Sequence, residues 1–283
     1  MSRIPAVWLV LIDILTVQLG AGIAKRLFDD ITPTGLVWIR LATSAVILVA
    51  MARPRLRGRS SRDWLVMAGF GLSLGVMNWA IYQSFSRIPL GIAVTIEFIG
   101  PLAVAVAGSR RARDLVWVLL AAAGVVLLGL ERGRLTVVGV ACALLAGVGW
   151  AAYILLSVET GRRWPGLDGL AAASVVATLL LTVPAVLSAG GTLVDPRLVA
   201  LGAAVGLLSS VIPYSFELHA LRTLPAATLG ILMSLEPAVA AMVGIVVVHE
   251  FLTPVQWLAV ACVVVASVGA TRSQPPPAAP VPD

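Results

Sequence analysis

Five charged side chains fall inside long apolar runs of this 283-residue sequence, where charge is costly. They are Asp13, Arg40, Glu97, Glu217 and Glu236. An ionised group at the centre of a membrane helix costs about 2.5–3.5 kcal/mol, so five together rival the whole stability of a folded domain, about 5–15 kcal/mol. These groups must therefore face a polar interior, pair with one another or lie near a helix end.

Glu97 and Glu236 are the strongest candidates for chemistry, because each precedes a proline in the middle of its run. Pro101 follows Glu97 by four residues, and Pro237 follows Glu236 directly. Proline removes a backbone donor and frees a carbonyl in the previous turn. In a membrane, such a break is tolerated where it faces protein or a water-filled cavity. Either acid could bind a cationic group or exchange a proton. The alternative is a structural carboxylate that hydrogen-bonds a neighbouring helix.

The other two acids differ in depth. Asp13 lies in the middle of the first apolar run and is a candidate for proton coupling. Glu217 lies near the predicted cytoplasmic end of its run, with His219 close by, so reaching the interface explains it better than a site role.

Arg40 has two open roles. It could pair with a carboxylate purely for structure, or its forked donors could clamp the carboxylate of a substrate. Asn78, Tyr82 and Tyr214 add hydrogen-bonding groups that could contact the same substrate. Tyrosines near the ends of membrane helices also commonly anchor them at the interface, and that alternative stays open for both.

No catalytic or metal-binding constellation is visible, so we expect neither an enzyme nor a cofactor. The stretch from Gly69 to Gly75 resembles a dinucleotide loop, but its last spacing is wrong and no strand precedes it. Gly71 and Gly75 have GxxxG spacing, which predicts close helix packing. Cys142 and Cys262 lie in apolar runs and are interpreted as small buried hydrophobes rather than a disulfide.

The composition determines which elements can carry these residues. Hydrophobic residues make up 59% of the chain and charged residues 12%, against about 25% charged in soluble domains. This is too little polar surface to coat a soluble core, so the outer solvent must be lipid. Barrel strands would alternate polar and apolar residues, which leaves helices. The sequence predicts ten spans, at residues 5–24, 33–52, 65–86, 90–108, 115–130, 137–157, 170–188, 198–221, 226–248 and 255–271.

The positive charge follows the topology rather than a nucleic-acid surface. The net charge is +6, and the basic residues lie in short loops between apolar runs. With the N-terminus inside, the inner segments hold 13 Lys and Arg residues and the outer loops hold 6. This bias predicts that both termini are cytoplasmic. Asp13 and Gln18 interrupt the first run, so we interpret it as a membrane helix rather than a signal peptide.

The chain also repeats itself. Matched pairs recur at offsets of 136 to 140 residues: Lys25 with Arg162, Pro89 with Pro225, Trp117 with Trp257, Gly129 with Gly269 and Arg132 with Arg272. The predicted units are a five-helix repeat over 1–134, a second over 135–272 and a disordered proline-rich tail over 273–283. Because five is odd, the second repeat must be inverted relative to the first. Inverted repeats characterise secondary transporters, whose substrate site lies near the midplane.

Several segments resemble a known family. The most specific run from Pro89 to Arg111 and from Met233 to Ala238, and others lie near Gln18–Phe28 and Pro213–Glu217. Together they resemble the EamA-type transporters of the drug/metabolite transporter superfamily, and within it the bacterial threonine/homoserine exporter subgroup. The resemblance implies ten helices in two repeats, a bacterial inner-membrane location and proton-driven efflux of amino acids.

The expected function is therefore a secondary active exporter of small amino acids, working by alternating access. The expected substrate contacts are Arg40, Asn78, Tyr82, Glu97, Tyr214 and Glu236, and the expected proton-coupling groups are Asp13, Glu97 and Glu236. The expected partners are a small-molecule substrate, protons and the lipid bilayer, and not nucleic acid; the sequence indicates no oligomeric state. An exporter of drugs or cationic metabolites is the alternative, which the acids suit and Arg40 disfavours. A channel or scaffold ranks lower, because it would not need two broken helices carrying acids at the midplane.

Overall fold

The described part of the chain is almost entirely helical. A computed structural model describes residues 6–107, 114–130, 135–211 and 226–273, together with Pro213 and Leu224, and contains no strand within them. The α-helices are α1 Ala6–Arg26, α2 Pro33–Ala52, α3 Ser61–Phe85, α4 Leu90–Glu97, α5 Ile99–Ala107, α6 Leu115–Leu130, α7 Val137–Arg163, α8 Asp168–Ala189, α9 Pro196–Gly206, α11 Ala226–Met233, α12 Glu236–Val243 and α13 Pro254–Ser273. Short 3₁₀ turns lie at η1 Leu27–Asp29 and η3 Gly190–Val194, and π turns at η4 Leu207–Val211 and η5 Gly244–Val248.

Eight helical stretches in the described residues are long and apolar enough to cross a membrane. The pair α4 and α5 forms one of them, and α11, α12 and η5 form another. Two shorter apolar stretches, Leu115–Leu128 and Pro196–Ser209, lie where the sequence predicts the fifth and eighth spans. The all-helical membrane class is therefore confirmed, and the count of ten stays a prediction.

Polar caps set where the helices begin. The Thr32 hydroxyl accepts a hydrogen bond from the Gly35 amide at 3.2 Å, with Pro33 at the first helical position. Ser60 and Asp63 form a reciprocal capping box at the start of α3. This cap starts α3 before the predicted residue 65, because hydropathy marks the apolar part of a helix and a cap marks its first turn.

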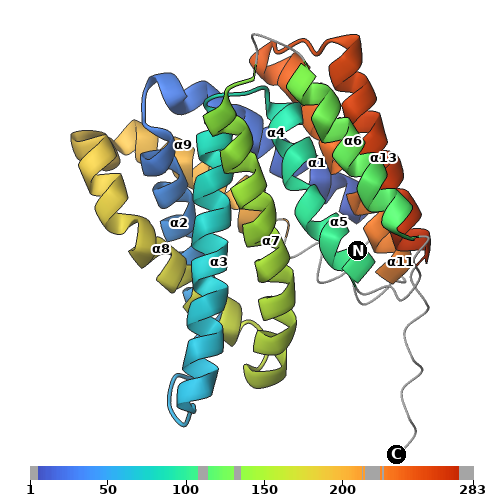
Figure 1. Ribbon diagram of the computed structural model, residues 1–283. Coiled ribbons are helices and arrows are strands. Elements are labelled where there is room, and N and C mark those ends of the chain that lie inside the picture. Colours follow the sequence, from blue (N-terminus) through green and yellow to red (C-terminus); the bar gives the residue numbers. More distant parts are fainter. Residues whose placement is uncertain are drawn as a thin grey trace, which may run out of the picture.

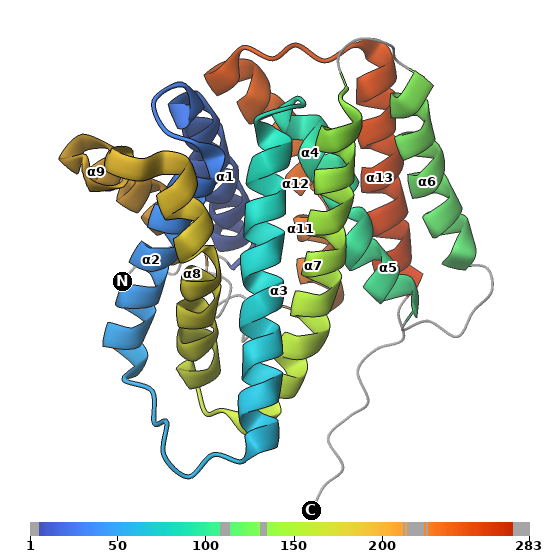
Figure 2. The same cartoon turned by 60° about the vertical axis from the view of Figure 1, so that its left-hand side comes forward.

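The described helices form one bundle, visible in Figures 1 and 2. In both views α2 and α8 lie on one side and α6 lies beside α13 on the other. Helix α3 packs on α7 and α8, α2 on α8 and α9, and α4 on α12. Gly71 brings the α3 and α8 backbones together, since a Cβ there would lie 2.7 Å from the Ala173 carbonyl oxygen. The GxxxG spacing thus marks a close helix contact, as predicted.

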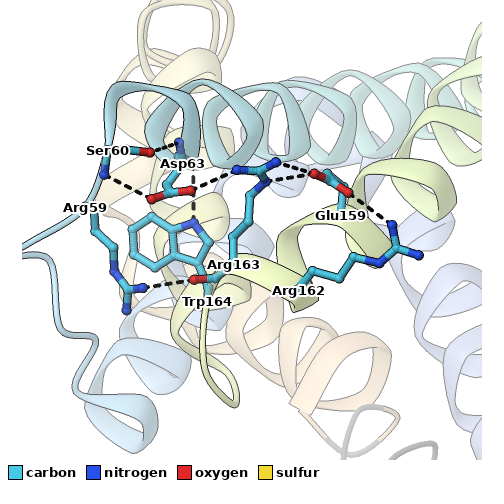
Figure 3. Close-up of polar contacts among 7 residues, drawn as sticks. All are labelled: Arg59, Ser60, Asp63, Glu159, Arg162, Arg163 and Trp164. Carbon is cyan, nitrogen blue, oxygen red and sulfur yellow. Dashed lines mark hydrogen bonds and ion pairs between the residues drawn. The ribbon is translucent and has the colours of Figure 1, made fainter. Parts of the chain in front are cut away.

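Ion pairs join helices at one end of the bundle, in a group that we call the Arg163 cluster: Arg59, Asp63, Glu159, Arg163 and Trp164 (Figure 3). The Arg163 guanidinium contacts the Asp63 carboxylate at 3.1 Å and the Glu159 carboxylate at 2.5 Å. Arg59 donates to the Arg163 carbonyl at 2.9 Å and lies over the Trp164 ring, 4.5 Å from its centroid. These contacts tie the start of α3 to the end of α7.

A second group, the Lys25 cluster, comprises Lys25, Arg26, His249 and Glu250 and lies at the other end of the bundle. Lys25 contacts the Glu250 carboxylate at 2.5 Å and donates to the Ile88 carbonyl at 2.7 Å. Arg26 donates to Nδ1 of His249 at 2.7 Å, and Glu250 also accepts from the amide that starts α4. The cluster therefore joins the end of α1, the start of α4 and the segment after η5.

Candidate functional site

Two membrane-depth helices are interrupted beside an acidic residue. Helix α4 ends at Glu97 and α5 begins at Ile99, while α11 ends at Met233 and α12 begins at Glu236. Both glutamates are 8% exposed. Pro101 cannot donate a hydrogen bond to the carbonyl of Glu97, which explains the first break. The prolines thus produce the interruptions expected from the sequence.

Neighbouring helices support each break closely. At the first, the Gly147 backbone of α7 lies against the Glu97 carbonyl, and a Cβ at Gly147 would lie 2.8 Å from that oxygen. At the second, the Ser234 hydroxyl lies 2.7 Å from the Ser267 hydroxyl of α13 and donates to the Gly230 carbonyl at 2.8 Å. The carbonyl of Glu97, freed at the first break, therefore faces protein, and a pair of hydroxyls links the second break to α13.

A cavity of about 220 Å³ lies at the level of these breaks. Its lining includes the charged residues Asp13, Arg40, Glu97 and Glu236 and the amide Asn78. The structure thus brings four of the five charges flagged in the sequence to one cavity, from α1, α2, α4 and α12. Three carboxylates and one guanidinium suit a ligand that carries both a positive and a negative group.

A π turn holds Arg40. One terminal nitrogen of its guanidinium donates to the Ser209 carbonyl of η4 at 3.3 Å. The Arg40 carbonyl accepts from the Ser44 hydroxyl at 2.9 Å, and Gly206 packs against it. Within the described ranges, Arg40 forms no ion pair and its Nε lacks a hydrogen-bond partner. The carboxylate pairing left open by the sequence is thus not seen among these residues, and π turns frequently occur at functional sites.

Two predicted tyrosine contacts have different outcomes. Tyr82 is fully buried and does not line the cavity; its ring lies 5.5 Å from the Arg40 guanidinium carbon. Tyr82 therefore packs against Arg40 outside the cavity lining, and its contact with a substrate stays a prediction. Tyr214 lies outside the described residues, as does Glu217.

Several lining residues were not predicted from the sequence. They are Gln18, Ser44, Trp150, Tyr153, Ser174 and Ser209. Ser44 and Ser174 donate to carbonyls one turn earlier in their own helices, as serines in apolar helices commonly do. Such residues cost little in lipid, so polarity alone did not mark them. For Gln18, the signal was present, because it interrupts the first apolar run.

The described residues hold no group of three potential metal ligands, and both cysteines are free and half-buried. The charged lining of the cavity is therefore the feature that defines this candidate site.

Known proteins match this chain along most of its length. The model of the EamA-like transporter family matches residues 137–272. The threonine/homoserine exporter RhtA of Escherichia coli K12 is 41% identical over 94% of this chain and 92% of its own length. The protein of the same name from Salmonella typhimurium LT2 is 40% identical over the same shares. An uncharacterised transporter of Bacillus subtilis, YwfM, is 29% identical over 54% of this chain and 53% of its own.

A solved crystal structure has a similar fold. It matches 94% of this chain and 96% of its own with a TM-score of 0.65, at 17% sequence identity. At that identity the likeness concerns the fold alone.

Proposed function

The chain belongs to the EamA-like transporter family and is related to threonine/homoserine exporters along nearly its whole length, and from this premise we propose that it exports small amino acids as a proton-coupled secondary transporter. It is a multi-pass membrane protein of the transporter class and not an enzyme. We propose its substrate, its coupling to protons and its transport mechanism.

The shared cavity of Arg40 and the three carboxylates carries the proposal. A zwitterion that enters a membrane cavity loses hydration at both ends, so each end needs a partner. Arg40 supplies the partner for the carboxylate, and Glu97 or Glu236 supplies the partner for the ammonium group. The carboxylate that does not bind the ammonium group, or that of Asp13, takes up a proton for the return step.

Cavity size favours an amino acid over the alternative of a drug or cationic metabolite. Sites for drug-sized ligands measure about 300–1,000 Å³, and this cavity measures about 220 Å³. The Arg40 guanidinium in the lining also opposes a ligand that carries only positive charge.

Helix pairing supports the proposed inverted repeat of ten spans. If 1–134 and 135–272 are related by a twofold axis, equivalent spans that lie near the axis pack on one another. The observed contacts are α2 with α8, α4 with α12 and α6 with α13. Both helix breaks fall in the fourth span of their unit, as the same relation requires.

Alternating access would require the Lys25 cluster to part. It joins α1, α4 and the segment after η5 at the face that we predict to lie outside. In the proposed cycle, substrate bound at Arg40 leaves outward only after these contacts open, while the Arg163 cluster keeps α3 and α7 together at the inner face.

The test is efflux from a host that lacks amino-acid exporters and expresses the full chain. We expect it to lower intracellular threonine and homoserine against a panel of other amino acids, dyes and cationic drugs. Purified protein in vesicles with an imposed pH gradient should reproduce the flux. Export of the cationic compounds alone would support the alternative, and no flux of any compound would support a scaffold.

Topology gives a separate prediction. The protein should lie in a bacterial inner membrane with both termini in the cytoplasm. The reason is that the predicted inner segments hold 13 basic residues and the outer loops hold 6. A reporter active only in the cytoplasm, fused after residue 283 or inserted near Arg57, should be active at both positions. The same reporter inserted between Thr192 and Asp195 should be inactive, and the reverse pattern would overturn the orientation.

A further inference from the structure

Gln18 lines the cavity and carries a buried acceptor that nothing described in the chain satisfies. The side chain lies on α1, is 3% exposed and lines the same cavity as Arg40. Its Oε1 has no hydrogen-bond partner in residues 6–107, 114–130, 135–211 or 226–273. Nearly all buried polar groups in proteins are hydrogen-bonded, so an acceptor left over at a cavity wall points to a polar group of the ligand.

Two more unsatisfied atoms lie at a different edge of the cavity. Nε of Arg40 and Oγ of Ser209 both lack partners within the described residues, and the Ser209 carbonyl holds the Arg40 side chain. Both groups can donate a hydrogen bond, which suits a carboxylate. This edge is therefore the place for the carboxylate end of the substrate.

Helix geometry separates Gln18 from that edge. Ser209 Oγ lies directly against Gly20 of α1. Gln18 precedes Gly20 by two residues, which is a rotation of about 200° around the helix. Val17 and Ala21 also line the cavity, so they span the face of α1 between the two edges. Gln18 thus meets a part of the substrate remote from its carboxylate.

We propose that Gln18 binds the side-chain hydroxyl of the exported amino acid and thereby selects hydroxylated amino acids over apolar ones of the same size. This inference rests on the proposed function as an amino-acid exporter. A hydroxyl donates to the carboxamide oxygen and accepts from its NH₂ group, so it satisfies either orientation of the amide. The ammonium group has stronger partners in Glu97 and Glu236, which leaves the neutral amide for a neutral group.

The preference for a hydroxylated substrate would depend on one hydrogen bond, between the substrate hydroxyl and Gln18. A substrate that places a methyl group against Oε1 leaves a buried acceptor unpaired, whereas a hydroxylated substrate does not. Sites of this kind reject the analogue lacking the hydroxyl far better than an apolar pocket rejects an added hydroxyl. Threonine and valine are the matched probes, because they differ only in a hydroxyl against a methyl group.

The experiment compares threonine and valine export by the full-length chain in vesicles, normalised to folded protein. Wild type should prefer threonine. Gln18→Leu should lower the threonine-to-valine ratio about tenfold or more by removing the acceptor, with valine flux kept or raised. Gln83→Leu is the matched control: Gln83 is also buried, but it bonds Thr34 at 2.9 Å and does not line the cavity. It should leave the ratio unchanged.

An unchanged ratio in Gln18→Leu, with both amino acids still exported, would overturn the role of Gln18 and leave the proposed function intact. Equal export of threonine and valine by wild type would also overturn it. If wild type moves no amino acid, the proposed function fails and the inference falls with it. Should Gln18→Leu not reach the membrane, Gln18→Met keeps the unbranched length of glutamine and is judged by the same ratio.

Discussion

Replacing Arg40 by alanine should nearly abolish amino-acid export per folded molecule, by about thirtyfold or more. Truncating one partner of a desolvated, hydrogen-bonded charge pair costs about 2–5 kcal/mol, and Arg40 is the basic side chain in the described lining of the cavity. Arg40→Lys should weaken export less, because lysine keeps the charge and loses the planar fork. Flux and detergent-extracted monodisperse protein should be measured together.

Substrate chemistry separates binding from a structural role. Threonine amide lacks the carboxylate, so any transport of it should suffer less than transport of threonine. Arg87→Ala is the control, because Arg87 bonds Gln83 at the end of α3 and does not line the cavity; it should export normally. If Arg40 has only a structural role, Arg40→Ala and Arg40→Lys should both lower the amount of folded protein. Normal threonine flux per molecule in Arg40→Ala would end the proposed clamp.

Neutralising the cavity acids should remove the response to a pH gradient in at least one variant. An amide matches a carboxylic acid in shape and cannot release a proton, so Asp13→Asn, Glu97→Gln or Glu236→Gln would fix the coupling group in its uncharged form. In that variant, gradient-driven export should fall more than tenfold. A change of that size corresponds roughly to the free energy of one lost charge-assisted hydrogen bond. Exchange of labelled for unlabelled threonine without a gradient should persist.

Two comparisons make this measurement decisive. Glu159→Gln removes an acid of the Arg163 cluster that does not line the cavity, and it should keep its response to the gradient. A variant that loses exchange as well as gradient-driven export has lost substrate binding, which would assign its acid to the ammonium group. Three variants that all respond normally would place the coupling group elsewhere in the chain or exclude proton coupling.

Apolar length alone was enough to locate the helices. The predicted spans 33–52 and 115–130 coincide with α2 and α6, because a span must match the thickness of the hydrocarbon layer. At the polar ends, helices extend beyond the predicted spans. Helix α7 continues to Arg163, past the predicted residue 157, since Arg163 finds two carboxylate partners there. Hydropathy does not detect such a continuation.

The candidate site could be predicted in part, for a related reason. Charges in lipid are so costly that Asp13, Arg40, Glu97 and Glu236 could be expected to share a polar space, and they line one cavity. Ser209 gave no such signal, because a serine costs little in an apolar helix. Its role depends on the π turn that directs its carbonyl to Arg40, and no residue pattern in the sequence indicated that turn.

The π turn η5 has a consequence for the history of the chain. In the proposed repeat, Pro89 and Pro225 are 136 residues apart, whereas Trp117 and Trp257 are 140 apart. Four residues were therefore gained between the proline and the tryptophan of the second unit, or lost from the first. A π turn closes its hydrogen bonds from i to i+5 and so accommodates one additional residue within a continuous helix. Because η5 lies in this interval, it is a place where one of these residues could be absorbed after duplication without ending the helix.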